Sequence, residues 1–270
     1  MSEPGLLYDV RDGVAYITFN RPEVHNAWNP EVMVRLAEAW NAVHEDDNVR
    51  VAIVTGTGDK AFSVGADLGH LIPVLTGARR PQDDWDRRVI EDRSLTRSAL
   101  LRGLPMYKPV VAAVNGYCLA GGMELLQGTD IRIAAEHASF GLSEAKRGLV
   151  PAGGSMVRLA RQVPFAKAME ILLTGDKVPA DEALRMGLVN YVVPADEVLP
   201  AAERFARTLA ANGPLAVRKI KEAVLRTSGV PLKDAYKIEG ECSTDVMSSQ
   251  DAIEGPRAFM EKRQPKFTGR

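Results

Sequence analysis

Short apolar runs alternate with helical stretches along the first half of the chain. Strands are expected over residues 14–19, 51–55, 109–114 and 131–134, where apolar and β-branched residues cluster. The run 51–55 is apolar on both faces, which is typical of a strand buried inside a parallel sheet. A helix is expected to begin at 29–31, because asparagine is a good N-cap and proline fits the first helical turn. Strands interleaved with helices predict an α/β fold.

The last quarter of the chain has only helical patterns. Helices are expected over 201–214, which ends at a Gly-Pro stop, over 215–227, and from about 232 to 262. We therefore divide the chain into an α/β core, residues 1–195, that carries the active site, and a C-terminal helical segment, residues 196–270. The apolar helix faces of this segment need burial, either on the core or on a partner.

Composition excludes several classes of protein. The 270 residues are 46% hydrophobic, so a large core can form, and 34 basic against 35 acidic residues leave no field that would attract nucleic acid or an acidic membrane. No apolar run approaches the roughly 20 residues of a membrane span, and the first residues lack the pattern of a signal peptide. Cys118 and Cys242 form no metal-ligand spacing, and Cys118 is expected to be a packing residue. These features favour the reducing cytoplasm.

Two adjacent glycines and a glutamate interrupt the apolar stretch VNGYCLAGGMEL, residues 114–125. Gly121 and Gly122 come just before an expected helix start at Met123. Backbone N–H groups at a helix N-terminus have no partner within the helix, and glycine lets a ligand oxygen approach them. Such a site suits a carbonyl oxygen that gains negative charge during a reaction. The turn at 65–67 offers a second donor, so the sequence predicts an oxyanion hole.

Two glutamates accompany these glycine turns. Taken singly, Glu124 is an ordinary first-turn glutamate, and Glu144 is a surface acid that pairs with Lys146 or Arg147. Taken together with both turns they favour acid–base chemistry, because two close carboxyl groups push each other's pKa apart.

Two other motifs carry weaker signals. GTGDKA, residues 56–61, matches the G-x-G-x-x-G/A pattern of dinucleotide-binding proteins, but the residues that follow make a poor first helical turn. Ser63 and Ser155 suggest a serine hydrolase, but none of the four histidines lies in a nucleophile-elbow context. We therefore expect a Gly-rich turn at 56–61 and no catalytic serine.

Five segments together resemble the crotonase family, the enoyl-CoA hydratases and isomerases, over nearly the whole chain. They are NRPEVHNA (20–27), AFSVGADL (61–68), AAVNGYCLAGGMEL (112–125), FGLSEAKRGLVPAGG (140–154) and EGPRAFMEKRQPKF (254–267). The resemblance implies a crotonase-like spiral of repeated ββα units with a C-terminal helical oligomerisation segment.

The resemblance also implies catalytic roles. The N–H groups of Ala66 and Gly121 would hold the thioester carbonyl, while Glu124 would activate water and Glu144 would protonate C2. Because both acids are present, hydration of a 2-enoyl-CoA is the expected reaction. Double-bond isomerisation or another acyl-CoA lyase reaction is an alternative within the family, and a non-catalytic acyl-CoA-binding protein is a third.

Coenzyme A would enter as part of the substrate, so no separate cofactor and no metal are expected. The resemblance places the following residues along the CoA channel or near its adenine and phosphates: Ala66, Asp67, Leu68, Gly69, Arg21, Val24 and Lys60. Plain solvent exposure is the alternative for Arg21 and Lys60. Phe259 and Lys262 match a tail that reaches the CoA phosphates of a neighbouring subunit, which implies a trimer or a dimer of trimers.

Residues 69–108 are longer than the corresponding segment of short-chain family members. The charged stretch 79–88 within them includes Trp85. Two interpretations stay open: a wall of the acyl pocket, which would suit a bulky or long acyl chain, or a solvated helical excursion. Ala120 stands where the family frequently has glycine, which tightens the turn before Gly121.

Overall fold

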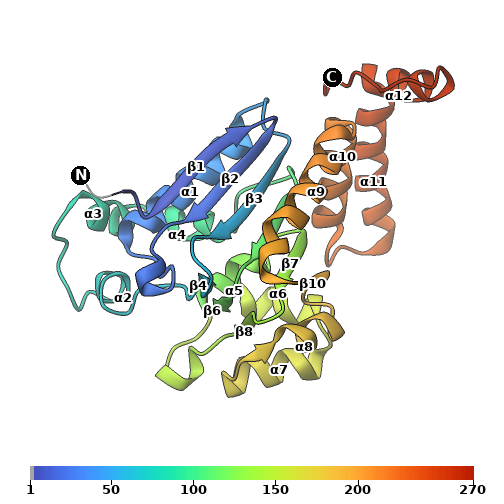
Figure 1. Cartoon of the computed structure of the whole chain (residues 1–270). Helices are drawn as coiled ribbons and strands as arrows, with labels where there is room; N and C mark the ends of the chain where they lie inside the picture. The colour runs from blue at the N-terminus through green and yellow to red at the C-terminus, as the bar shows by residue number, and fades with distance from the viewer. Residues whose placement is uncertain (1–2) are drawn as a thin grey trace.

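A computed structural model describes residues 3–270 and contains two β-sheets (Figure 1). The first two strands of the larger sheet form a hairpin whose two-residue turn, Asp12 and Gly13, has positive φ angles of 49° and 76°. All its other neighbouring strands are parallel. In spatial order the strands are β1 (Leu6–Arg11), β2 (Val14–Phe19), β3 (Val51–Gly56), β5 (Val110–Val114), β7 (Ile131–Ala135) and β10 (Tyr191–Val193).

The smaller sheet consists of very short strands. Its order is β4 (Ala61–Ser63), β6 (Tyr117–Leu119), β8 (Ser139–Gly141) and β9 (Val178–Pro179), and the first three are parallel. Each of these three follows a strand of the larger sheet and leads toward a helix. The expected repetition of ββα units is therefore confirmed.

Helices cover the larger sheet. Helix α1 (Pro30–Glu45) begins as predicted, with the Asn29 side chain accepting a hydrogen bond from the Val32 N–H at 2.9 Å, and packs on β1 and β2. Helix α9 (Val198–Ala211) packs on β3, β5 and β7. Helix α9 belongs to the predicted C-terminal segment, 196–270, but it packs on the sheet of the predicted core, 1–195. The division of the chain into these two parts stays a prediction.

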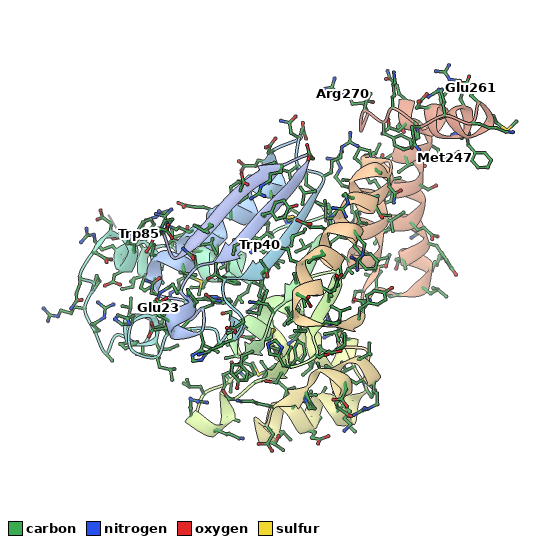
Figure 2. The ribbon with its side chains drawn as sticks, in the orientation of Figure 1. Glu23, Trp40, Trp85, Met247, Glu261 and Arg270 are labelled. Carbon is green, nitrogen blue, oxygen red and sulfur yellow. The ribbon has the colours of Figure 1, made fainter. Side chains whose placement is uncertain are left out.

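Residues 69–108 form three short helices: α2 (Leu71–Leu75), α3 (Asp84–Glu91) and α4 (Arg93–Ala99). Helices α3 and α4 pack against α1. Trp85 of α3 lies with the guanidinium groups of Arg35 and Arg88 at 5.1 and 5.7 Å from its ring centroid, and Figure 2 shows it on the side of the molecule opposite the C-terminal helices. Helices α3 and α4 therefore pack on the core, whereas residues 75–78 and 80–84, from the end of α2 to the start of α3, are exposed to solvent.

The remaining helices follow in order: α5 (Gly121–Leu126), α6 (Ser155–Gln162), α7 (Phe165–Thr174), α8 (Ala180–Arg185), α10 (Pro214–Thr227), α11 (Leu232–Met247) and α12 (Gln250–Met260). Helix α5 starts two residues earlier than expected. Helices α10 and α11 pack on each other, and together with α12 they project from the body of the molecule (Figure 1). Among residues 3–270, no helix combines the length and apolarity needed to cross a membrane.

The expectation of one helical stretch from 232 to 262 is wrong, because the chain turns between α11 and α12. The Ser249 side chain caps α12 by accepting a hydrogen bond from the Ala252 N–H at 3.2 Å, and a serine that satisfies a backbone donor favours a helix start over helix continuation.

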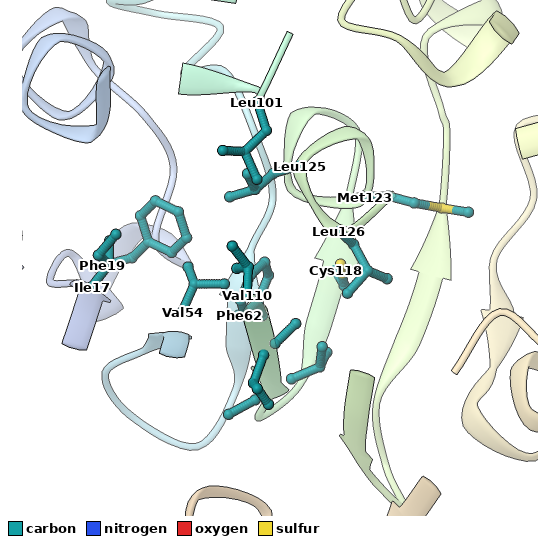
Figure 3. Packing of buried hydrophobic residues seen from close by; sticks show 14 of the residues in the cluster. Ile17, Phe19, Val54, Phe62, Leu101, Val110, Cys118, Met123, Leu125 and Leu126 are labelled. Atoms are coloured by element: carbon teal, nitrogen blue, oxygen red, sulfur yellow. The ribbon is translucent and has the colours of Figure 1, made fainter. Parts of the chain in front are cut away.

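The core extends from the larger sheet to helix α5. Leu125 and Leu126 of α5 lie in one buried cluster with Val110 of β5, Phe62 of β4 and Cys118 of β6 (Figure 3). The prediction that Cys118 is a packing residue is therefore confirmed. Because α5 carries Glu124, this packing fixes the helix that presents the acid.

The close approach of α5 to β4 gives a first prediction. A Cβ atom on Gly122 would lie 2.3 Å from the Ser63 carbonyl oxygen, whereas one on Gly240 of α11 would meet no heavy atom within 4 Å. We expect Gly122→Ala to lower the free energy of unfolding by about 1–3 kcal/mol. Gly240→Ala, the matched control, should raise it by about 0.5–1 kcal/mol. Urea denaturation measures both, and equal effects would contradict the packing described.

Candidate active site

Three turns that carry predicted site residues meet at one edge of the smaller sheet. Strands β4, β6 and β8 are parallel neighbours, so their C-terminal ends lie at the same edge. Ala66 follows the end of β4, Gly121 follows β6, and Glu144 follows β8. Ligands bind at this end of the strands in parallel sheets, because the connecting loops gather there.

The glycine turns after β4 and β6 touch each other. Gly65 has a φ of 80°, and a Cβ atom added to it would lie only 2.3 Å from the Gly121 nitrogen. A Cβ atom on Gly121 would lie 2.9 Å from Cζ3 of Trp28. Only residues without side chains allow the two backbones to come this close.

The backbone around these turns directs two amides away from regular pairing. The Trp28 N–H donates to the Gly65 carbonyl at 2.8 Å, and the Asp67 N–H donates to the Trp28 carbonyl at 2.9 Å. These two bonds form a bridge between Trp28 and Ala66 that does not use the Ala66 amide. Gly121 is the first residue of α5, where an N–H has no acceptor within the helix. Both residues line the same cavity, as an oxyanion hole requires.

Ala120 holds the turn in a strained conformation. Its φ of 47° and ψ of −123° lie in a region that glycine favours, which costs on the order of 1–3 kcal/mol. Its N–H donates to the Gly141 carbonyl at 2.8 Å, and its carbonyl accepts from the Glu124 N–H at 2.9 Å. These bonds tie the turn to β8 and to α5, and they account for the persistence of the strain.

A cavity of about 690 Å³ unites the predicted residues. Ala66, Gly121, Glu124 and Glu144 all line it. Further apolar wall is supplied by Ile72 and Leu75 of α2, by Leu100 after α4, and by Leu149 and Val150. The segment 69–108 therefore forms part of the cavity wall, which agrees with the first of its two interpretations.

Glu124 lies almost completely inside the protein. It is 6% exposed, and one carboxylate oxygen accepts a hydrogen bond from the Ser155 N–H at 3.4 Å. Burial and the nearby charge of Glu144 raise the pKa of Glu124 to about 7, while the amides of Ser155 and Gly153 and the charge of Arg102 oppose the rise. This carboxyl group can therefore exchange a proton near neutral pH.

Glu144 lines the same cavity from the loop after β8. Burial raises the pKa of Glu144, against the lowering effect of its own backbone amide and of Arg147. Within residues 3–270, its Oε2 atom is buried and accepts no hydrogen bond, and Glu144 forms no ion pair. Lys146 pairs instead with Asp176, so the interpretation of Glu144 as a paired surface acid is wrong.

The residues expected to bind CoA separate into two groups. Val24, Asp67 and Leu68 line the cavity with Ala66, whereas Arg21, Lys60, Gly69, Phe259 and Lys262 are not part of its lining within the described chain. Arg21 is not simply solvent-exposed, because its guanidinium donates to the Ala27 carbonyl at 2.7 Å and to the Asp67 carboxylate at 3.3 Å.

The weaker motifs have structural explanations. Strand β4, not a helix, follows the Gly-rich turn at 56–61, so the geometry of a dinucleotide site is absent from that part of the described chain. The Ser63 hydroxyl donates to the Asn26 carbonyl at 2.8 Å and accepts from the Gly65 N–H at 3.0 Å, which shapes the first oxyanion turn.

Sequence reasoning missed Leu100, Arg102 and Gly153, which also line the cavity. A Cβ atom on Gly153 would lie 2.4 Å from Oε2 of Glu124, so this glycine makes room for the carboxylate. The glycine pair in PAGG was a visible signal for such a contact, but nothing in the sequence indicated that the contact would be with Glu124.

The raised pKa of Glu124 predicts an unusual stability change. The pKa of Glu124 is 4.5 in the unfolded chain and about 7 in the folded chain. Its stabilising contribution to the free energy of unfolding is therefore complete below about pH 4.5 and is lost as the pH rises through 7. Relative to the wild type, Glu124→Gln should therefore gain about 2–3 kcal/mol of unfolding free energy between pH 5 and pH 8. Urea denaturation at both pH values measures this gain.

The matched control for this measurement is Glu136→Gln, which removes an exposed carboxylate outside the cavity. If the gain in unfolding free energy between pH 5 and pH 8 is no larger for Glu124→Gln than for Glu136→Gln, the environment assigned to Glu124 is wrong.

Comparisons with known proteins identify the family of the chain. The family model described as "Enoyl-CoA hydratase/isomerase" matches residues 9–270. "Enoyl-CoA hydratase EchA19" of Mycobacterium tuberculosis is 43% identical, covering 100% of this chain and 98% of the relative. "(E)-benzylidenesuccinyl-CoA hydratase" of Thauera aromatica is 35% identical, covering 97% and 98%. A crystal structure of an enoyl-CoA hydratase from M. tuberculosis H37Rv superimposes with a TM-score of 0.88 at 40% identity, covering 99% and 100%. The chain therefore belongs to the crotonase family of enoyl-CoA hydratases and isomerases.

Proposed function

We propose that this chain is an enoyl-CoA hydratase, which reversibly adds water across the 2,3 double bond of a 2-enoyl-CoA thioester to give a 3-hydroxyacyl-CoA. The observation that carries the proposal is that Ala66, Gly121, Glu124 and Glu144 line one cavity. Two amides and two acids are the groups that this reaction needs. An acyl-CoA-binding protein without activity would not need the acids.

The two amides would stabilise the charge that develops on the thioester oxygen. When water adds at C3, the carbonyl oxygen gains enolate character, and the N–H groups of Ala66 and Gly121 donate to it. Fixed donors in a cavity shielded from water need no reorganisation during the reaction, which makes them effective for this purpose.

The two glutamates would divide the proton transfers. Glu124, whose pKa of about 7 allows it to accept a proton near neutral pH, takes one from the attacking water. Glu144, whose pKa is also raised by burial, delivers a proton to C2. Because the two carboxyl groups interact, they titrate as a pair, and the reverse reaction uses each in the opposite protonation state.

The acyl group would occupy the part of the cavity that α2 and α4 enclose. Ile72, Leu75 and Leu100 make this wall apolar, and the volume of about 690 Å³ is within the range of sites that bind drug-sized molecules. This favours a bulky or long acyl chain over a crotonyl group. The relative from Thauera aromatica is named for a benzylidenesuccinyl group, which is consistent with a roomy pocket.

We also propose that the chain assembles as a trimer or a dimer of trimers. The projecting helices α10 to α12 expose large apolar side chains, among them Ile220 at 66%, Tyr236 at 62% and Phe259 at 82%. Figure 2 shows Met247 and Glu261 at the far end of this projection, well away from the body of their own chain. In an assembly, Phe259 and Lys262 would contribute to the CoA site of a neighbour.

Replacing each acid tests the proposed reaction. Glu124→Gln and Glu144→Gln should each lower kcat for hydration about 10²–10⁴-fold, because each removes one proton-transfer group. The loss of enone-thioester absorbance with a series of short, long and ring-bearing 2-enoyl-CoAs measures hydration, and the exposed Glu136→Gln variant is the control. A reaction that survives one of the two substitutions would indicate an isomerase, and strict preference for crotonyl-CoA would contradict the bulky acyl group.

The assembly can be tested separately. Light scattering should give the mass of three or six chains of 29.3 kDa each. Lys262→Gln should raise KM for an enoyl-CoA about fivefold, as loss of one phosphate contact worth about 1 kcal/mol predicts, whereas Lys233→Gln on the exposed face of α11 should not. A monomer with full activity would contradict this proposal.

A further inference from the structure

A series of hydrogen-bonded polar groups begins at Glu124 and continues through residues that do not line the cavity. Ser155, the first residue of α6, donates its backbone N–H to Oε1 of Glu124 at 3.4 Å. The Ser155 hydroxyl accepts a hydrogen bond from Nε2 of Gln127 at 2.7 Å. Ser155 is fully buried and Gln127 is 2% exposed, so water cannot replace either bond without entering the core.

The series of hydrogen bonds continues to the core sheet. The Gln127 backbone carbonyl accepts from Nε2 of Gln162 at 2.8 Å, and Oε1 of Gln162 accepts from the Arg132 guanidinium at 3.0 Å. Arg132 is 8% exposed and also donates to the Leu188 carbonyl at 3.0 Å. Because Arg132 belongs to β7, the polar chain links the acid to a rigid element.

The geometry indicates a specific role for this series of hydrogen bonds. Gln127 follows Glu124 by three residues, so the two side chains leave nearly the same face of α5. The loop before Ser155 is irregular and contains Gly148 and Gly154, with φ angles of 67° and 137°. The Arg102 guanidinium holds the Ala152 carbonyl of this loop at 2.6 Å, and the Gln127 hydrogen bond is the contact that ties the Ser155 side chain to the end of α5.

We propose that Gln127 and Ser155 are positioning residues for Glu124: the Gln127 side chain fixes Ser155, and the Ser155 amide holds the Glu124 carboxylate in the orientation that water activation requires. Neither side chain needs to touch the substrate. The catalytic consequence rests on the proposed hydration, whereas the orientation of the carboxylate does not.

Loss of this tie should change the titration of Glu124 in a defined direction. An amide that donates to a carboxylate stabilises the charged form, so weakening the Ser155 contact should raise the pKa of Glu124 further. The other charged groups that act on Glu124 are Glu144 from the loop after β8, Arg102 from the segment after α4, and Arg158 from α6. Substitution of Gln127 leaves all three in place.

The experiment compares the wild type with Gln127→Met and Ser155→Ala in the full-length protein. Methionine keeps the unbranched shape of Gln127 but cannot donate to Ser155, and alanine removes the acceptor while keeping the backbone amide. Thr129→Val is the matched control, because Thr129 is also buried just after α5 and its hydroxyl donates to the Leu126 carbonyl at 2.7 Å rather than to Ser155 or Glu124.

Two readouts are measured. Infrared difference titration follows the protonated carboxyl band that Glu124→Gln lacks, and its midpoint should rise by about 0.5–1 pH unit in both variants. With the best 2-enoyl-CoA of the series, kcat should fall about 10–100-fold with little change in KM, and the acidic limb of the pH profile should move to higher pH. Thr129→Val should shift neither quantity.

The outcomes separate the two proposals. An unchanged infrared midpoint in Gln127→Met and Ser155→Ala, or lowered thermal stability with normal kcat and pH profile, would overturn the positioning role while hydration stands. A wild type that hydrates no 2-enoyl-CoA would overturn the proposed function, and the infrared titration would still decide whether Gln127 and Ser155 orient the acid. If one of the two variants fails to fold, the other decides.

Discussion

The parallel pairing of three very short strands is the constraint on which the site depends. Strands β4, β6 and β8 run in one direction, so the three turns that follow them emerge at one edge. Those turns carry Ala66, Gly121 and Glu144, which are far apart in the sequence. If one strand were reversed, its turn would lie at the opposite edge, and the amides would no longer share a cavity with the acid. Close contact at Gly65 and Gly121 then brings two of the turns directly against each other.

Burial is the second determinant of the site, and it affects both the acids and the amide donors. Burial raises the pKa values of Glu124 and Glu144. The same low polarity strengthens the attraction between an amide dipole and a developing negative charge. Together with the strained backbone of Ala120, the buried acids lower the stability of the folded chain near neutral pH. Sites of this kind persist because the surrounding packing over-determines them.

Sequence patterns identified the elements with strong local signals. The strands predicted at 14–19 and 51–55 and the helix that begins at Pro30 follow from apolar periodicity and capping chemistry, and the structure confirms them. The three-residue strands of the smaller sheet were not predicted, because three residues are too few to show an alternating pattern. The break at Ser249 was missed for a related reason: a single serine cap is a weak signal within a long run of helix-forming residues.

By itself, the sequence determined which groups are available: glycine turns that can expose amides, two glutamates in unfavourable apolar surroundings, and motifs that resemble one enzyme family. Only the tertiary structure decided which of these groups meet. It brought the glutamates into one cavity, left Lys60 and Phe259 out of the lining of that cavity within the described chain, and placed the Ser155 amide against Glu124. The physical reason is that local preferences act over a few residues, whereas the contacts that tune an acid are made by side chains and amides from distant segments packed around it.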